Sequence, residues 1–245
     1  MNREETDARL AEKLAREAGE MLLAIQRGRL TGAELGKAGD IEANAFLMQA
    51  LRALRPDDGI LSEEERDNFE RLDHRRVWIV DPLDGTREYS EGRTDWAVHV
   101  SLAIDGVATH GAVALPGLGV TYASDVPPPL APINAPLRML VSRTRPAREA
   151  MAVAEAMGAE LHPLGSAGAK AMAVLAGTAD IYLHTGGQYE WDNCAPVAVA
   201  QAAGLHVSRP DGGPMRYNNR DTYLPDLLVC RKEVADEVMA RFIAL

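Results

Sequence analysis

A short apolar run that stops at an acidic motif constrains this chain more than any other feature. Residues 77–80 are Val-Trp-Ile-Val, a continuous apolar run typical of a strand buried on both faces. Pro82 cannot donate to a strand ladder, so Asp81 and Asp84 are expected on a turn at the end of that strand. Residues 85–86 (Gly-Thr) are then expected to open a helix.

Two carboxylates on one corner, next to a helix start, predict a cation site. Asp81 and Asp84 would converge, and a hard divalent cation is the natural bridge between them. The backbone N–H groups of Gly85 and Thr86 would help to hold a phosphate at the same place. The same residues also fit an ordinary turn with a Thr at a helix cap, and alone they do not decide between the two interpretations.

Two further acidic motifs favour the cation site. Leu-Ser-Glu-Glu-Glu occupies 61–65 and Glu-Trp-Asp occupies 190–192. Without context, the acidic triplet would be interpreted as a solvated face. In order and spacing, however, Glu63-Glu64, the motif from Asp81 to Thr86 and Trp191-Asp192 resemble the inositol monophosphatase-like family of metal-dependent phosphatases. The resemblance implies that family's αβαβα sandwich, with an antiparallel N-terminal sheet and a mixed, largely parallel C-terminal sheet.

The resemblance also implies how the acidic residues divide the cations between them. The first site would be made by Glu63, Asp81 and the Leu83 carbonyl, and the second by Asp81, Asp84 and Asp192. Oxygen-only ligands favour Mg²⁺, in two or three ions, with Mn²⁺ as a substitute. Sensitivity to Li⁺ is a further expectation from the family.

Water activation is the second implied function. By resemblance, Thr86 and Asp40 would orient and deprotonate the attacking water, and Glu63 is counted with them as catalytic, with Glu64 behind it. From local sequence, Asp40 is expected to be the N-cap of a helix over 41–54. Lys37 stands where the family usually has Thr, so the surroundings of Asp40 depart from the pattern.

Details around the motifs resemble the CysQ branch, whose members are similar to 3′(2′),5′-bisphosphate nucleotidases. The implied reaction removes the 3′-phosphate of adenosine 3′,5′-bisphosphate (PAP), a by-product of sulfate assimilation, and leaves AMP. The residues expected to contact this small phosphate ester are Gly85, Thr86, Ser142, Arg143, Gly165, Ser166, Lys170, Glu190 and Tyr217. Arg143 and Lys170 could equally be ordinary helix-end charges, and Tyr217 a packed turn residue.

Other functions remain open at this point. An inositol-1-monophosphatase or a fructose-1,6-bisphosphatase would share the metal chemistry and differ in the walls of the pocket. A catalytically silent nucleotide or metal sensor is a different class. Such a sensor would need metal ligands but not the water-activating pair Thr86 and Asp40.

Composition excludes some partners. The net charge of −10 and the lack of a basic run disfavour a nucleic-acid polymer. Cys194 and Cys230 form neither a disulfide framework nor a zinc-finger spacing, which is typical of reduced core residues. No apolar run has the length of a membrane span, and the first residues lack an apolar signal segment, so a cytoplasmic protein is expected, as a monomer or homodimer.

The rest of the chain predicts two domains, 1–132 and 133–245, divided at a proline-rich connector over 127–132. Before it, a helix over 7–27 and the helix over 41–54 precede a short strand at 60–61, a hairpin return over 66–76 and a meander. The meander strands are 95–104, 107–115 and 119–123, in which His99 and His110 are expected as sheet residues rather than ligands. After the connector, strands and helices alternate as in an α/β sheet.

Overall fold

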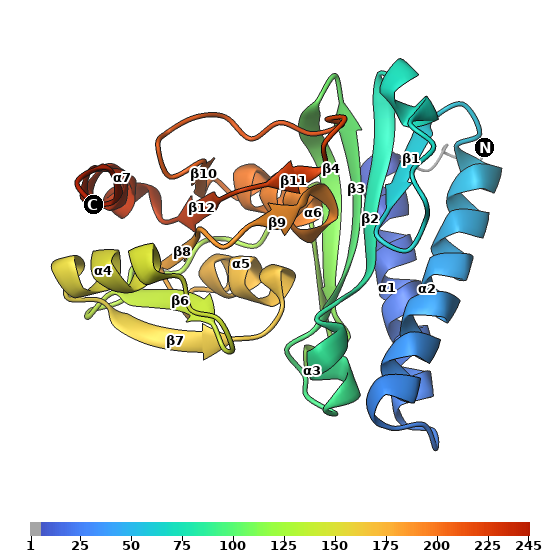
Figure 1. Cartoon of the computed structure of the whole chain (residues 1–245), viewed down its shortest axis with the longest axis horizontal. Helices are drawn as coiled ribbons and strands as arrows, with labels where there is room; N and C mark the ends of the chain where they lie inside the picture. The colour runs from blue at the N-terminus through green and yellow to red at the C-terminus, as the bar shows by residue number, and fades with distance from the viewer. Residues whose placement is uncertain (1–5) are drawn as a thin grey trace.

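Helical and sheet layers alternate through the molecule. The computed structural model describes residues 6–245, so the sequence expectation about the first five residues lies outside it. Figure 1 shows α1 (Asp7–Gln26) and α2 (Gly32–Leu54) on one side of the first sheet, with α5 (Ala167–Leu175) and α6 (Glu190–Ala202) between the two sheets. The second sheet is covered by α4 (Arg148–Met157) and α7 (Ala235–Ile243). The expected αβαβα sandwich is confirmed.

The first sheet has the order β1-β2-β3-β4-β5. Its strands are β1 (Gly59–Ser62), β2 (Arg76–Asp84), β3 (Ala97–Ile104), β4 (Val107–Leu115) and β5 (Val120–Ala123). The expected antiparallel meander is confirmed as β3 to β5, and β2 also pairs antiparallel with β3. The hairpin expected across 66–76 is wrong, because β1 and β2 are parallel and are joined by a crossover with the 3₁₀ helix Glu70–Asp73.

The second sheet has the order β10-β12-β8-β6-β7 and is mixed. Its strands are β6 (Arg138–Ser142), β7 (Glu160–Leu164), β8 (Ile181–His184), β10 (His206–Ser208) and β12 (Leu227–Cys230). Only the pairs β6·β7 and β6·β8 are parallel, because the last strands return beside β8 in the opposite direction. The short strands β9 (Gln188–Tyr189) and β11 (Tyr223–Leu224) form a separate pair.

Strand β2 continues through the acidic motif, which corrects the turn expected at Asp81. Asp81 pairs with His99 and Asp84 with Ala97, and the register shifts between them. The irregularity takes up Pro82, which has no N–H to give to the ladder. A five-residue helix, α3 (Thr86–Ser90), then follows Gly85. Asp81 and Asp84 are therefore fixed by a sheet, which is stiffer than a turn.

Helix α2 begins nine residues earlier than expected, at Gly32. Asp40 lies inside it and is not an N-cap. The glycine-containing stretch does not break the helix, because its glycines allow close packing. A Cβ on Gly39 would lie 2.9 Å from side-chain atoms of Leu83 and Tyr89. Helix packing against the β2–α3 corner thus overrides the low helix propensity of glycine and brings Asp40 beside Thr86.

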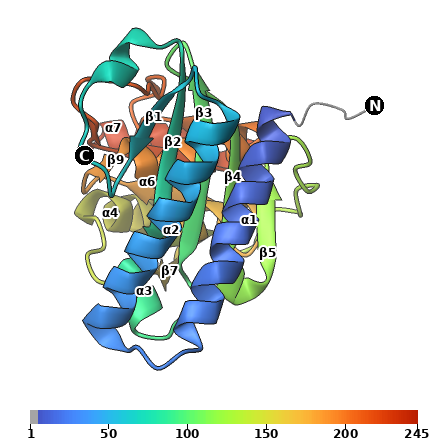
Figure 2. The same ribbon diagram turned by 90° about the vertical axis from the view of Figure 1, so that its right-hand side faces the viewer.

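Among the described residues, three apolar cores fill the space between the layers of helices and strands. One lies between the first sheet and the helices α1 and α2 that cover it (Figure 2), and it includes Trp78 and Val80. The opposite face of β2, with Val77 and Ile79, packs on α5 and α6 in a core that also includes residues of the second sheet. Because this core is shared, it joins the residues before and after the connector. The domain division at 132/133 stays a prediction. Within residues 6–245 no helix is long and apolar enough to cross a bilayer.

Two leucines of α2 test the contribution of the first core. Leu47 is fully buried and Leu54 is 46% exposed. We expect Leu47→Ala to lower the free energy of unfolding by about 2–5 kcal/mol, because it leaves a cavity. Leu54→Ala, the same change in the same helix, should cost less than about 1 kcal/mol. Urea denaturation measures both, and equal losses would contradict the layer arrangement.

Candidate metal centre and active site

Three aspartates from two distant parts of the chain meet at the centre of the molecule. Asp81 and Asp84 come from the end of β2, and Asp192 comes from the first turn of α6. Each offers a carboxylate oxygen, and these atoms all lie within 4.8 Å of one another. The structure therefore brings together three of the residues that the sequence assigned to cations. Glu63 follows β1 and lies close enough for its pKa to depend on Asp81, Asp84 and Asp192.

Asp84 is held by groups that the sequence did not identify. Its carboxylate accepts hydrogen bonds from the backbone N–H of Ala167 (3.3 Å) and of Gly168 (2.7 Å), at the start of α5. His99 Nε2 lies 3.2 Å from the same carboxylate, and His99 Nδ1 lies 3.0 Å from the Trp191 carbonyl oxygen. His99 is a buried sheet residue, as expected. It also connects Asp84 to the start of α6.

The acidic cluster needs a positive charge. Burial and the neighbouring carboxylates raise the pKa of Asp81 well above its usual value. Burial and Asp192 raise the pKa of Glu63 to about 7, and burial and Asp84 raise that of Asp192 to about 6. Burial acts on Asp84 in the same direction, but His99 and the Gly168 N–H hold its pKa below the usual value. Clustered oxygen donors that resist joint ionisation fit a hard divalent cation.

Asp40, which is not part of the aspartate cluster, lies beside Thr86. Thr86 Oγ1 is 3.3 Å from Asp40 Oδ1 and 3.1 Å from the Leu83 carbonyl oxygen, so its hydroxyl can donate to either acceptor. Burial and the charge of Glu64 raise the pKa of Asp40 to about 6, while the hydrogen bond from Thr86 opposes this rise. The predicted contact between Thr86 and Asp40 is therefore present, with Asp40 in the middle of a helix, while its role in activating water stays a prediction.

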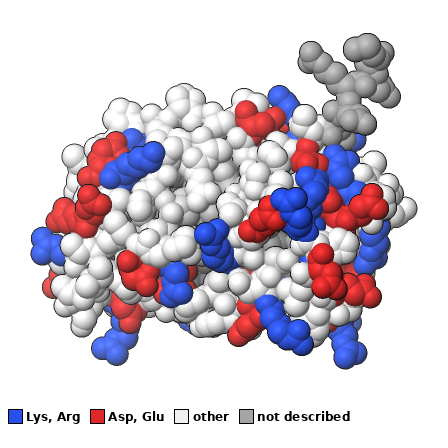
Figure 3. Space-filling model, turned by 90° about the horizontal axis from the view of Figure 1, so that it is seen from above, with Lys and Arg blue, Asp and Glu red and all other residues white. Residues whose placement is uncertain are grey.

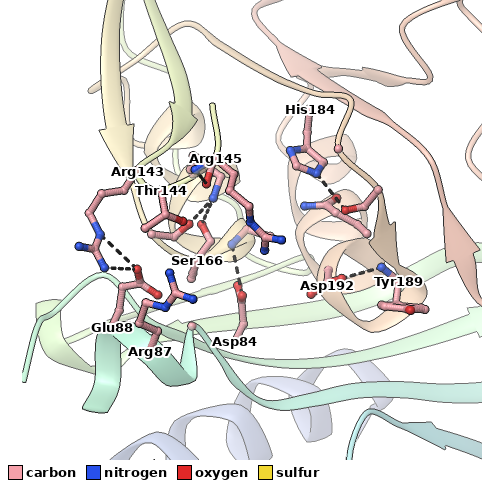
Figure 4. Close-up of a pocket in the computed structure, with 18 of the residues that line it drawn as sticks. Asp84, Arg87, Glu88, Arg143, Thr144, Arg145, Ser166, His184, Tyr189 and Asp192 are labelled. Atoms are coloured by element: carbon pink, nitrogen blue, oxygen red, sulfur yellow. Dashed lines mark hydrogen bonds and ion pairs between the residues drawn. The ribbon is translucent and has the colours of Figure 1, made fainter. Parts of the chain in front are cut away.

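A cavity of about 530 Å³ opens over the cluster. It is lined by residues of segments 84–88, 142–145, 165–170 and 182–192, together with Tyr223. Figure 4 shows Asp84 and Asp192 in the lower part of the view, with Arg145 and His184 above them. Of the predicted substrate-binding residues, those that line the cavity are Gly85, Thr86, Ser142, Arg143, Gly165, Ser166 and Lys170.

The two predicted phosphate-binding cations are already engaged inside the protein. Arg143 forms ion pairs with Glu88 (2.8 Å) and Glu91 (2.9 Å). Lys170 is buried and donates to the carbonyl oxygens of Gly165 and Ser166, and its burial lowers its pKa to about 8. Both can contribute positive charge to the cavity wall, but neither is a free surface cation.

Glu190 and Tyr217 do not line the cavity, which corrects their expected role in substrate contact. Glu190 is fully buried, and its carboxylate accepts hydrogen bonds from Asn218 and Asn219. The Tyr217 hydroxyl donates to Asn193 Oδ1 (2.9 Å) in the interior. Glu190 is two residues from Asp192 in sequence, but on a helix this spacing points the two side chains to different sides.

Sequence reasoning missed several cavity residues. Tyr189 and Tyr223 are about half exposed there, and Tyr189 stacks on Trp191 with ring centroids 4.9 Å apart. His184 also lines the cavity, and its pKa is lowered by burial and by the positive charges of Lys170 and Arg145. Lys170 and Arg145 thus place positive charge near His184, on a wall that also carries Asp84, Glu88 and Asp192. The available signal was that Arg145 and His184 both lie near the carboxyl ends of strands of the second sheet.

Comparison with known proteins agrees with this geometry. The sequence model of the inositol monophosphatase family matches residues 3–127 and 129–243, almost the whole chain. This chain belongs to the inositol monophosphatase family. A solved family member, CysQ from Bacteroides thetaiotaomicron, superposes with a TM-score of 0.77 at 25% identity, covering 93% of this chain and 98% of that one.

Curated family members include phosphatases of a bisphosphorylated nucleotide. A Mycobacterium leprae protein named 3′-phosphoadenosine 5′-phosphate phosphatase is 50% identical, with 94% of this chain and 91% of that protein aligned. The 3′(2′),5′-bisphosphate nucleotidase CysQ of Escherichia coli K12 is 30% identical over 86% of this chain and 94% of its own length. The resemblance to the CysQ branch is therefore confirmed at the level of sequence.

Gly168 tests the packing around Asp84. A Cβ at this position would lie 2.1 Å from His99 Nε2. Helix propensity alone predicts that Gly168→Ala stabilises α5 by about 1 kcal/mol. We expect the opposite, a loss of roughly 1–3 kcal/mol in the free energy of unfolding, because His99 must move away from Asp84. Urea denaturation decides between the two signs, and a stabilised variant would show that His99 is not confined there.

The raised pKa values predict how the metal-free protein depends on pH. Glu63, Asp192 and Asp40 bind protons more tightly when folded than when unfolded. The free energy of unfolding should therefore fall as the pH rises from about 4 to about 7, and level off above that. Urea midpoints in EDTA at several pH values measure this. Added Mg²⁺ should reduce the slope, and a rising stability over this range would contradict the arrangement of the cluster.

Proposed function

We propose that the protein is a Mg²⁺-dependent phosphatase that hydrolyses the 3′-phosphate of PAP to AMP and phosphate, as a step linked to sulfate assimilation. The observation that carries this proposal is the meeting of Asp81, Asp84 and Asp192. Asp84 and Asp192 line the cavity together with Thr86, whose hydroxyl lies within hydrogen-bonding distance of Asp40. The names of the aligned relatives support the choice of substrate.

The acidic residues would hold two or three Mg²⁺ ions, or Mn²⁺ in their place. Asp81, Asp84 and Asp192 supply oxygen ligands, with Glu63 and the Leu83 carbonyl completing the set. Bound divalent cations neutralise phosphoryl oxygens, make a water more acidic and stabilise the leaving oxygen. The contacts of Asp84 with α5 and His99 leave less freedom for its carboxylate, which pre-organises this side of the site.

Thr86 and Asp40 would act on the attacking water. When the Thr86 hydroxyl donates its hydrogen bond to Asp40, the Thr86 oxygen keeps lone pairs that can accept a hydrogen bond from water. Asp40 can take up the proton that the water releases, since a pKa of about 6 lies near neutral pH. The water oxygen then bonds to phosphorus as the bond from phosphorus to the ribose 3′-oxygen breaks.

The cavity wall favours a nucleotide over a cyclic polyol. Tyr189 and Tyr223 present exposed aromatic surface, and their ring centroids are 6.0 Å apart in an edge-to-face arrangement. Stacking of a base on an aromatic side chain contributes about 1–3 kcal/mol. Inositol and fructose phosphates have no aromatic ring and would gain nothing comparable. The positive charges of Arg145 and Lys170 suit a second phosphate on the same substrate.

Other expectations remain predictions from the sequence. They include a cytoplasmic location, inhibition by Li⁺, a monomer or homodimer, and no nucleic-acid polymer as partner. On the face in Figure 3, positive and negative side chains are interspersed and form no continuous basic surface, which supports the last of these.

Phosphate release tests the proposal. We expect the highest kcat/KM for PAP among PAP, inositol 1-phosphate and fructose 1,6-bisphosphate, each assayed with Mg²⁺. Asp84→Asn serves as the control for contaminating phosphatases and should be inactive, because the carboxylate ligand is lost. A preference for inositol 1-phosphate would reject the substrate assignment. Metal and nucleotide binding without any hydrolysis would instead favour a sensor.

A further inference from the structure

The loop around Asn218 and Asn219 is hydrogen-bonded to Glu190, the first residue of α6. The Glu190 carboxylate accepts hydrogen bonds from the backbone N–H of Asn218 (2.7 Å) and of Asn219 (2.8 Å), and from the Asn219 side chain (2.8 Å). Asn218 has a left-handed φ of 60°, a conformation that asparagine tolerates better than most residues and that lets two successive N–H groups converge. A fully buried carboxylate is thus satisfied by one short loop.

Arg71 hydrogen-bonds the same loop to the crossover between β1 and β2 of the first sheet. Its side chain is 1% exposed and donates to the Asn218 Oδ1 (2.7 Å), the Asn219 carbonyl oxygen (2.8 Å) and Asp67 Oδ2 (2.8 Å). Asn218 donates back to the Arg71 carbonyl oxygen (3.3 Å). Arg71 belongs to the 3₁₀ helix Glu70–Asp73, in the crossover between β1 and β2. We call Arg71, Asn218, Asn219 and Glu190 the clasp.

The clasp joins the two groups of metal ligands from outside the metal centre. At one end, Arg71 lies in the crossover between β1 and β2. Strand β1 leads to Glu63, and β2 ends at Asp81 and Asp84. At the other end, Glu190 is the first residue of α6, and Asp192 follows on the same turn. Residues two apart on a helix point about 200° apart, so Glu190 can be fixed in the interior while Asp192 faces Asp84.

We propose that the clasp is a positioning device that fixes the first turn of α6, and with it Asp192, at the correct distance from Asp81 and Asp84. This rests on the cation site of the proposed function, but not on its substrate. Arg71 and Glu190 are positioning residues, since neither lines the cavity. The role expected of Glu190 changes accordingly, from contact with substrate to placement of a metal ligand.

Mn²⁺ binding to the full chain without substrate, measured by titration calorimetry, tests the proposal. We expect Arg71→Met to weaken Mn²⁺ binding roughly tenfold, the lower end of what loss of a group that orients a metal ligand costs. The matched control is Arg231→Met. Arg231 is also a buried arginine that donates to a backbone carbonyl oxygen, that of Ala131, but it lies outside the clasp. Its variant should bind Mn²⁺ as the unmodified protein does.

If Arg71→Met does not fold, the less disruptive variant Asn218→Gly tests the same contacts. Asn218→Gly keeps the left-handed backbone, because glycine adopts it freely, and removes the side-chain contacts with Arg71 together with a 3.5 Å contact with the His74 carbonyl oxygen. It should weaken Mn²⁺ binding several-fold and lower kcat at saturating Mg²⁺, with the KM for substrate little changed.

The outcomes separate the clasp from a purely structural role. If clasp variants and Arg231→Met lose thermal stability alike but all bind Mn²⁺ normally, the positioning role is overturned. If the unmodified protein binds Mn²⁺ and the clasp variants do not, yet PAP is not hydrolysed, the clasp stands and the proposed function fails.

Discussion

Mutual repulsion among clustered carboxylates is the constraint on which the rest of this structure depends. Asp81, Asp84, Asp192 and Glu63 lie close enough to change one another's pKa. Asp81 and Asp84 are buried, which removes the water that would screen them. The protein offsets part of this cost with His99 and the first N–H groups of α5, both directed at Asp84. The remaining negative charge is what makes the site a cation site.

A strand and a helix hold the three clustered aspartates in place. Two aspartates lie at the end of a strand that is buried on both faces, and the third is on the first turn of a helix packed between the two sheets. Asp40 is carried by a long helix whose glycines let it approach the same corner. Pre-organisation of this kind lets charges act on a substrate without rearrangement.

The order of the acidic motifs was sufficient to predict the meeting of Asp81, Asp84 and Asp192, the contact of Thr86 with Asp40 and the layered fold, while their role as metal ligands stays a prediction. Propensity and hydrogen-bonding rules placed Asp81 on a turn and Asp40 at a helix cap, and both placements were wrong. Local rules omit packing: a bulge absorbs Pro82 within the sheet, and close contact with Leu83 and Tyr89 keeps the helix continuous through Gly39. Arg143, Lys170 and Glu190 show the same limit, since sequence reveals a charge but not its partner.

The sequence by itself determined which chemistry this protein can perform, because only particular residue types can bind cations and activate water. The tertiary structure alone decided which of the charged residues are free to take part. Arg143 is paired with Glu88 and Glu91, and Glu190 is enclosed by Asn218 and Asn219. The physical reason is that a charge acts over a few ångströms, and such distances between residues far apart in the chain are set by packing.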